Sequence, residues 1–376
     1  MSMLRKLVMM LLMSVAVSYP LAANAQGKEK ASDKKQMTEE EKAAADMEKA
    51  LKRAKASEAF FTTVTPLEVT LTTNIKRIRN DKGEEAPWRG ATLSYKGADG
   101  KDVVLPMQIK TRGIWRKKNC DFPPLRLNFK GEQTKGTLLD GINKPKLVNY
   151  CRDNDDYEQY LIQEAQLYRV YNLLTPASHR MRLLTVNYVD SASGKVHAHR
   201  TGILLEEPDV MAARNGGPIM DDMKGAIAED LDPFHDALVG LFSYFIGNTD
   251  FSIYALHNVE LVNQPSGQVL PVAFDFDFSG VINTSYATVD PKLPIQNVRF
   301  RLFRGYCQNT EDYQKAIAKF NEQKPAIYAL YSDEIGKMLK PKVVESTLKY
   351  FDEFYKTVND PKRAKREIAE DCVKTN

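Results

Sequence analysis

Three aspartates in the second half of the chain have the residue type and spacing of a cation site. Asp250 follows a Gly-Asn-Thr turn, and Asp275 and Asp277 alternate with phenylalanines between Phe274 and Phe278. Residues two apart in an extended strand project to the same side, so we expect the carboxylates at 275 and 277 to lie together. Carboxylate oxygens are ligands that magnesium and manganese prefer. Burying these carboxylates in an apolar stretch without a counter-cation would cost free energy through repulsion and desolvation. The stretch therefore predicts a bound divalent cation.

Other interpretations of the same residues stay open. A structural calcium site would use the carboxylates of Asp275 and Asp277 equally well, because calcium also takes oxygen ligands. Asp250 would need no further role if it only shaped the turn, a position that Asp and Asn favour. No partner carboxylate or nucleophile stands at a recognisable spacing from His257, which we interpret as a packed or hydrogen-bonded histidine.

The elements predicted around the aspartates would present them at a helix end and a strand end. Residues 233–246 are strongly apolar and predict a helix that stops at the Gly-Asn turn before Asp250. Residues 258–262 and 269–274 predict two short strands joined by a Pro-Ser-Gly-Gln turn, and Asp275 follows the second strand.

The first half of the chain has a different pattern, in which apolar and polar residues alternate. This period of two predicts an antiparallel β-rich region, and helical spacing predicts a helix over residues 157–174. A Gly-rich polar stretch at 209–232 predicts a boundary, and from residue 311 the helical period dominates. The predicted strands are 67–73, 91–95, 103–109, 124–129, 183–189 and 201–205.

Taken in order, several blocks resemble the CotH family of spore-coat kinases and its bacterial relatives, an atypical protein-kinase group. In the second half these are the Gly-Asn-x-Asp loop at 247–250, an Asn-containing strand, and a Pro segment leading to the Asp-x-Asp pair at 275–277. Together with further blocks upstream, they follow the family's order over roughly residues 67–290. The upstream blocks are 109–113, 122–127, 161–165 and 201–207.

The resemblance implies both a fold and an activity. The implied fold is α+β and two-lobed, protein-kinase-like, with a β-rich N-lobe at 58–207 and a helix-rich C-lobe at 208–376. The implied activity is that of a metal-dependent phosphotransferase, which uses Mg or Mn with ATP to move the nucleotide γ-phosphate to a protein or glycan hydroxyl. The alternative is a non-catalytic, pseudokinase-like binding or scaffold module of the cell envelope.

The resemblance also implies roles for single residues. Asp250 becomes the catalytic aspartate, and Asp275 and Asp277 become the metal ligands. Kinases place a metal-binding Asn five residues after the catalytic Asp; Ala255 stands there, so Asn258 is the candidate. Proline replaces the family's usual phosphate-binding lysine, and no Gly-rich loop is present. The candidate nucleotide-binding residues are Glu164, Arg126, Lys146, Arg112 and Glu206.

Residues 1–25 have the order of regions of a cleavable signal peptide. Arg5 and Lys6 precede an apolar run at 7–17, and an Ala-Asn-Ala motif supplies the small residues that signal peptidase accepts. The apolar run is shorter than the about 20 residues needed to span a bilayer, and no later stretch is long and apolar enough. The sequence therefore predicts an exported protein, periplasmic or secreted, without a transmembrane segment.

Composition narrows the expected partners. The 53 Lys and Arg nearly balance the 49 Asp and Glu, so charge predicts no nucleic-acid partner. The partners we expect are a nucleotide and an exported protein or glycan acceptor. Residues 26–57 are rich in Lys, Glu and Ala and predict a charged spacer, although a capping-box motif also permits a solvated helix at 37–57.

The chain contains four cysteines, an even number that predicts two disulfides in an oxidising compartment. Three connectivities are possible. We predict Cys120–Cys151 and Cys307–Cys372, because both other pairings would link the two predicted lobes and hinder their closure.

Overall fold

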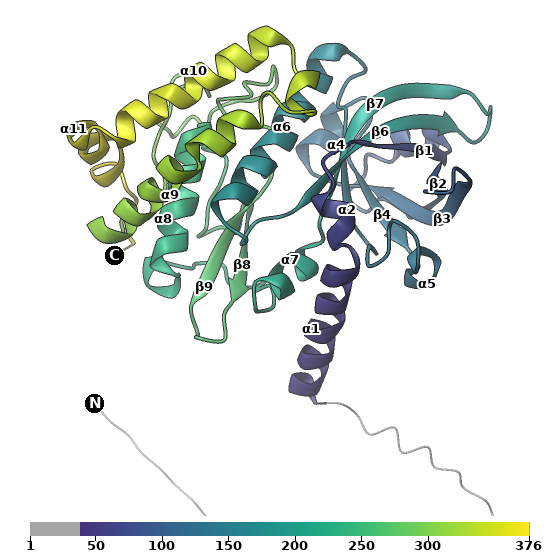
Figure 1. Ribbon diagram of the computed structural model, residues 1–376, viewed down its shortest axis with the longest axis horizontal. Helices are drawn as coiled ribbons and strands as arrows, with labels where there is room; N and C mark the ends of the chain where they lie inside the picture. Colours follow the sequence, from purple (N-terminus) through teal and green to yellow (C-terminus); the bar gives the residue numbers. More distant parts are fainter. Residues whose placement is uncertain (1–37, 376) are drawn as a thin grey trace, which may run out of the picture.

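The computed structural model describes residues 38–375 (Figure 1). The predicted signal peptide at 1–25 and the first part of the predicted spacer lie outside these residues. The described chain contains a closed β-barrel and, beside it, a mainly helical part with a two-stranded sheet. Each has its own hydrophobic core. Among residues 38–375 there is no helix with the length and apolar character that crossing a membrane requires.

Seven strands form the barrel, in the order β1-β2-β3-β4-β5-β7-β6. Neighbouring strands from β1 to β5 pair antiparallel, and the β6–β7 hairpin fills the remaining gap. β7 pairs antiparallel with β5, and β6 pairs parallel to β1. The strands are β1 (Leu67–Thr73), β2 (Arg89–Lys96), β3 (Asp102–Thr111), β4 (Leu125–Phe129), β5 (Lys146–Asn149), β6 (Met181–Asp190) and β7 (Val196–Leu205).

The two-lobed protein-kinase-like fold that the resemblance implies is wrong. The β-rich lobe of such a fold would be an open sheet, whereas the strands of this protein close into a barrel. Closure depends on the register that sets Leu67 opposite Leu184 and Thr73 opposite Asp190. These partners are far apart in the chain, and a local period of two identifies strands without identifying their partners.

Along the strands of the barrel, side chains point alternately into the core and outward. In β3 and β4, residues such as Ile109 and Leu127 point into the core and are fully buried. The residues between them face outward, and the register sets Lys110 opposite Arg126 and Arg126 opposite Lys146. Three adjacent strands therefore carry a row of cations on their outer face.

The helix α6 (Asp155–Leu174) lies between the barrel and the helices of the mainly helical part (Figure 1). It confirms the helix predicted over 157–174 and begins two residues earlier, where the Asn154 side chain accepts a hydrogen bond from the Tyr157 amide. Most of its residues are buried, since it contacts both β7 and the helix α9 (Thr310–Ala329). This position explains why an acidic residue of α6, Glu164, lies in the interior.

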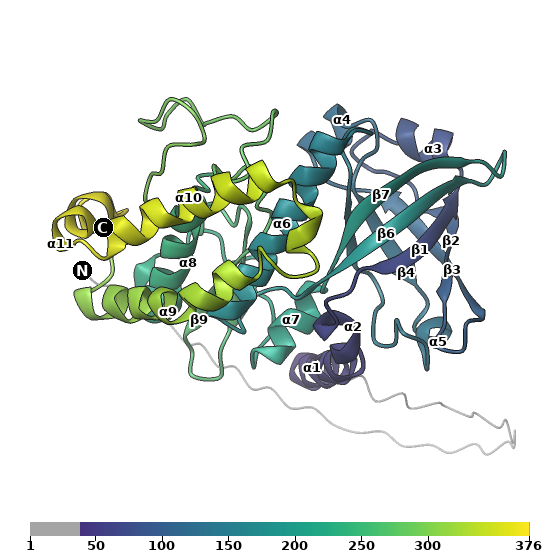
Figure 2. The same cartoon turned by 45° about the horizontal axis from the view of Figure 1, so that its top comes forward.

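The helical part is built around α8 (Pro233–Ile246), which is almost entirely buried. The hairpin β8 (Val259–Asn263) and β9 (Val269–Ala273) follows it in the chain. Apart from α1, described below, the other helices of the described chain are α2 (Glu58–Thr62), α3 (Ile75–Asn80), α4 (Trp115–Asn119) and α5 (Gly131–Thr134) at the barrel, and α7 (Pro208–Arg214), α9 (Thr310–Ala329), α10 (Pro341–Val358) and α11 (Pro361–Ala364) after it (Figure 1 and Figure 2). Short helical turns lie at Ala228–Asp230, Gly336–Met338 and Lys365–Ala369.

The segment predicted to be a charged spacer contains a packed helix, α1 (Glu39–Ala56), which lies beside α7 (Figure 2). Ala50 and Ala54 are buried. Arg53 forms ion pairs with Glu207 and Asp209. Composition gave no sign of this contact, because small alanines and one arginine make it without any large apolar residue.

Both predicted disulfides are confirmed. Cys120 pairs with Cys151 across a Cα–Cα distance of 4.6 Å, and Cys307 pairs with Cys372 across 4.9 Å. The first joins two loops next to the barrel. The second fixes the end of the chain to the segment before α9, where the Cys307 amide also donates to the carbonyl of Val373.

Candidate functional site

The turn that presents Asp250 begins where α8 ends. Gly247 adopts the left-handed conformation (φ 68°) that terminates this helix, and a Cβ here would lie 2.0 Å from the Tyr350 hydroxyl. The Asp250 amide then donates to the Asn248 side chain at 3.0 Å. The turn therefore requires glycine, and Asp250 emerges from it with its side chain 39 % exposed.

Two neighbouring side chains hold the Asp250 carboxylate. His257 Nε2 lies 2.9 Å from Asp250 Oδ1, and this hydrogen bond raises the pKa of His257. The Asn258 amide donates to Asp250 Oδ2 at 3.1 Å and to the Asp250 carbonyl at 2.7 Å. Asn258 was a candidate metal ligand, and the structure gives its side-chain amide a positioning contact with Asp250.

Asp275 lies two residues after the end of β9 and is connected to Asp250 through Asn258. The Phe274 amide donates to the Asn258 carbonyl at 3.0 Å, and the Asn258 side chain contacts Asp250. Asp275 is left-handed (φ 62°), an unfavourable conformation for a residue other than glycine. Its amide donates to the Tyr168 hydroxyl at 3.0 Å. The residue that carries this carboxylate is therefore held in an uncommon backbone conformation.

Asp277 is buried close to Asp275, with only 8 % of its side chain exposed. The Tyr286 hydroxyl donates to Asp277 Oδ2 at 3.0 Å, and Arg116 Nη1 lies 3.8 Å from the same oxygen. Burial, followed by the charge of Asp275, raises the pKa of Asp277 to about 7. A cation bound between them would relieve their repulsion.

Glu164 of α6 adds a third acidic group to this region. Its side chain is buried, and Oε1 has no hydrogen-bond partner among residues 38–375. Burial, with the charges of Asp277 and Asp275 adding to it, raises the pKa of Glu164 well above its ordinary value. A buried carboxyl oxygen without a partner is costly, so this atom fits a place where a cation or ligand is accommodated.

Two arginines from the barrel face the acidic group. Arg112 follows β3, and burial lowers its pKa while the charge of Asp275 opposes that change. Arg116 lies on α4; burial would lower its pKa too, but the charges of its acidic neighbours raise it. Arg116 was not among the predicted residues, and the available signal was a second arginine four positions after Arg112.

Arg126 and Lys146 lie on adjacent strands of the cationic row. Arg126 Nη1 donates to the Lys144 carbonyl at 3.0 Å. Lys146 Nζ lies 3.6 Å from Glu260 Oε1 and 4.5 Å from the centre of the Phe274 ring. Burial lowers the pKa of Lys146, and Glu260 opposes that change. Lys146 therefore links the barrel to the β8–β9 hairpin.

Glu260 was not among the predicted site residues, because nothing in the sequence distinguishes it from other polar residues of a strand. Its Oε2 lies 2.9 Å from His179 Nε2. Burial alone would raise the pKa of Glu260, but His179 and Lys146 lower it to about 2. Glu260 is thus a charged anchor for Lys146.

Glu206, a predicted nucleotide-binding residue, lies in a separate ion-pair network. Arg180 and Arg214 donate to both of its carboxylate oxygens, at distances of 2.7 to 3.0 Å. Burial would raise the pKa of Glu206, but the two arginines lower it. Its carboxylate is therefore engaged in holding β7 and α7 together.

The donor set fits a magnesium or manganese ion in one specific way. Among the described residues, no three His, Cys, Asp or Glu side chains are placed to hold a metal by themselves. Magnesium, however, is commonly bound by one or two carboxylates together with phosphates and water. Asp275 and Asp277 would supply the two carboxylates, and Glu164, whose pKa their charges raise, would add a third acidic group.

No family model matches the chain, and no curated protein matches it. The geometry and charges of the residues themselves are therefore what any functional conclusion must use.

Proposed function

We propose that this protein is a metal-dependent phosphotransferase that moves the γ-phosphate of ATP to a hydroxyl group. The observation that carries the proposal is the buried Asp277, 3.8 Å from Arg116, together with the half-buried Asp275 beside it. The residue before Asp275 is hydrogen-bonded to Asn258, which in turn contacts Asp250. Phosphoryl transfer needs these parts: acidic metal ligands, cations for the phosphates and a carboxylate near the acceptor. A relationship to the CotH family belongs to the same proposal and rests on the sequence blocks rather than on the fold.

Each group has a task in the proposed reaction. Arg112, Arg116 and Lys146 would bind phosphate oxygens, and Asp250, the more exposed acid, would orient the acceptor hydroxyl. The acceptor oxygen bonds to the γ-phosphorus while the bond from phosphorus to the β–γ bridging oxygen breaks. The hydroxyl proton passes to Asp250, and the nucleoside diphosphate leaves with the electron pair. When bound, the metal supplies charge neutralisation on the β- and γ-phosphates.

A second candidate function is non-catalytic binding by an envelope module. The observation that favours it is the occupation of Asp277 Oδ2 by the Tyr286 hydroxyl, with Arg116 beside it. A protein that keeps this contact would not release the oxygen to a metal, and its site would bind a ligand without transferring phosphate.

The two disulfides suit an oxidising environment outside the cytoplasm. Periplasmic or secreted location, and an exported protein or glycan as acceptor, are parts of the proposal.

Incubation with γ-labelled ATP and manganese tests the activity. We expect the wild type to transfer label, and Asp275→Asn to lose at least about 100-fold in rate, because removing one charge-stabilising group costs about that much. Asp102→Asn, an exposed aspartate at the start of β3, is the matched control and should change the rate less than about twofold. Equal activity in wild type and Asp275→Asn would contradict the catalytic role.

Thermal unfolding with Mg-ATP separates the two candidates. Ligand at about 100 times its dissociation constant stabilises a protein by about 2.7 kcal/mol. Stabilisation without label transfer would favour the non-catalytic module, and absence of both would contradict nucleotide binding altogether.

A further inference from the structure

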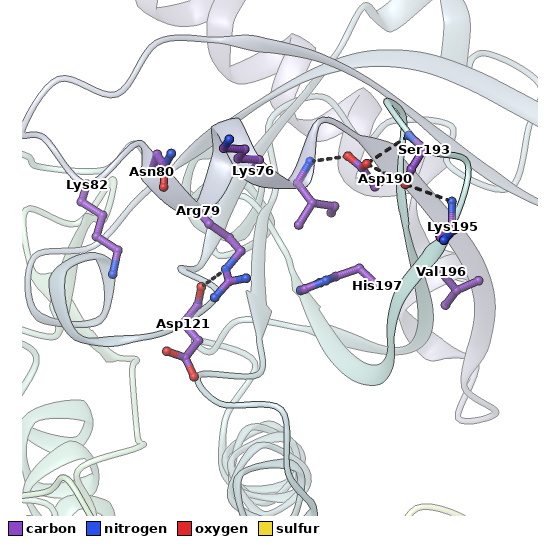
Figure 3. Close-up of a pocket in the computed structure, with 11 residues that line it drawn as sticks. Lys76, Arg79, Asn80, Lys82, Asp121, Asp190, Ser193, Lys195, Val196 and His197 are labelled. Atoms are coloured by element: carbon purple, nitrogen blue, oxygen red, sulfur yellow. Dashed lines mark hydrogen bonds between the residues drawn. The ribbon is translucent and has the colours of Figure 1, made fainter.

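A second set of basic side chains lines a cavity at the barrel, away from the aspartates. The cavity has a volume of about 590 Å³ and is formed by α3, the chain after it, the loop at Asp121 and the turn of the β6–β7 hairpin (Figure 3). None of its lining residues belongs to the candidate site described above. Its lining residues with charged or titratable side chains are Lys76, Arg79, Lys82, Lys195, His197, Asp121 and Asp190.

The cavity has an excess of positive charge that the protein does not neutralise. Within residues 38–375, Lys76, Arg79, Lys82 and Lys195 form no ion pair within 4.0 Å. Figure 3 shows Arg79 reaching into the space between α3 and the hairpin, beneath Lys76. These four cations outnumber the two acidic residues that line the same hollow, so the arrangement favours a bound anion.

The two acidic residues do not offset this charge equally. Asp190 is a structural clamp: Oδ1 accepts from the Ile75 amide at 3.2 Å, and Oδ2 accepts from the Ser193 amide and hydroxyl at 3.1 and 2.8 Å. The hydrogen bonds, that of the Ser193 side chain above all, lower its pKa. Asp121 extends away from the Arg79 guanidinium in Figure 3 and contacts it only through its carbonyl.

Two of the four cations are held by hydrogen bonds to the backbone. Arg79 Nε donates to the Asp121 carbonyl at 3.0 Å, and Lys82 Nζ donates to the Cys120 carbonyl at 3.3 Å. The disulfide from Cys120 to Cys151 fixes this loop, and the Asp121 amide donates to the Cys151 carbonyl at 2.9 Å. Groups held in place before binding lose less entropy when a ligand arrives.

We propose that this cavity binds a ligand that carries two or more phosphate groups. Four separated cations match several anionic oxygens better than a single carboxylate, and Lys and Arg are the residues that bind phosphate. The volume lies within the about 300 to 1,000 Å³ typical of small-ligand sites. The same chemistry could be presented by a soluble diphosphate or by a lipid with two phosphates. The inference is independent of phosphotransfer at the aspartates.

Calorimetry with pyrophosphate tests the soluble source, and sedimentation with phosphatidylcholine vesicles, with or without cardiolipin, tests the lipid source. EDTA in all samples excludes metal-dependent binding at Asp275 and Asp277. We expect saturable binding in one of the two assays, weakened at least about tenfold in the double variant Arg79→Gln/Lys195→Gln, because each lost cation removes a charge-assisted hydrogen bond.

A matched double variant removes the same charge elsewhere. Lys135 and Lys349 are exposed, and Lys135→Gln/Lys349→Gln should weaken binding less than about twofold. Equal weakening in the control would show nonspecific attraction to net charge and overturn the proposal. So would absence of binding to both pyrophosphate and cardiolipin vesicles.

Discussion

Asp236 offers a sharp test of the electrostatics of the helical core. It lies on α8 without exposed surface, Gln308 Nε2 donates to its Oδ2 at 2.8 Å, and Oδ1 has no partner within residues 38–375. Burial raises the pKa of Asp236 to about 7, and the Gln308 hydrogen bond opposes part of that change. We predict that Asp236→Asn stabilises the protein at neutral and higher pH. Asparagine keeps the shape and the acceptor for Gln308 but carries no charge.

The magnitude follows from the difference between the folded and unfolded pKa values. Asp236 changes from 3.8 when unfolded to about 7 when folded, and about three pKa units correspond to about 4 kcal/mol. Because the folded pKa is the higher one, the wild type has this contribution of about 4 kcal/mol to its free energy of unfolding below about pH 4 and loses it as the pH rises to about 7. The new amide hydrogens lack an acceptor, which costs about 1 to 2 kcal/mol. The net gain expected above pH 7 is therefore about 2 to 3 kcal/mol.

Urea unfolding of wild type and Asp236→Asn, with disulfides intact, measures this difference between about pH 5 and pH 8. The free-energy gain of the variant should grow with pH and level off above about pH 7. Asp102→Asn, an exposed aspartate, serves as the control and should show little pH-dependent difference. A gain that does not change with pH, or a destabilised variant at pH 8, would refute the reasoning.

Two further predictions concern the ends of the chain. Arg53→Ala should lower the free energy of unfolding by about 2 to 3 kcal/mol, because it leaves the buried Glu207 with fewer partners and detaches Asp209; unchanged urea unfolding would show that α1 does not stabilise the protein. Replacing Cys307 and Cys372 by serine should cost about 4 kcal/mol, as loop entropy predicts for a separation of 65 residues; calorimetry of the variant measures the loss, and an unshifted melting temperature would contradict it.

Local patterns predicted what depends on local chemistry. The helix over residues 157–174 was visible because its apolar spacing spans several turns, and Gly247 marked a helix end because a left-handed residue is needed there. The disulfides were predictable because each joins loops within one half of the chain.

The features that escaped prediction all depend on distant partners. Pairing of β1 with β6 cannot be read from either strand alone, and it decided the fold. Glu206 matched a functional block, yet Arg180 and Arg214 engage it. Arg116 matched no block, although it lies 3.8 Å from Asp277. The charge on each residue was evident from the sequence, but what compensates it was not.

The barrel's closure also determines the order in which the protein can fold. While the chain emerges from its N-terminus, β1 to β5 can pair in sequence, but β1 and β5 remain as open edges. Such edges are templates for pairing with other chains. The β6–β7 hairpin covers both at once, β6 against β1 and β7 against β5. The interval before residue 205 appears is thus the period of greatest aggregation risk, and the hairpin is the element that ends it.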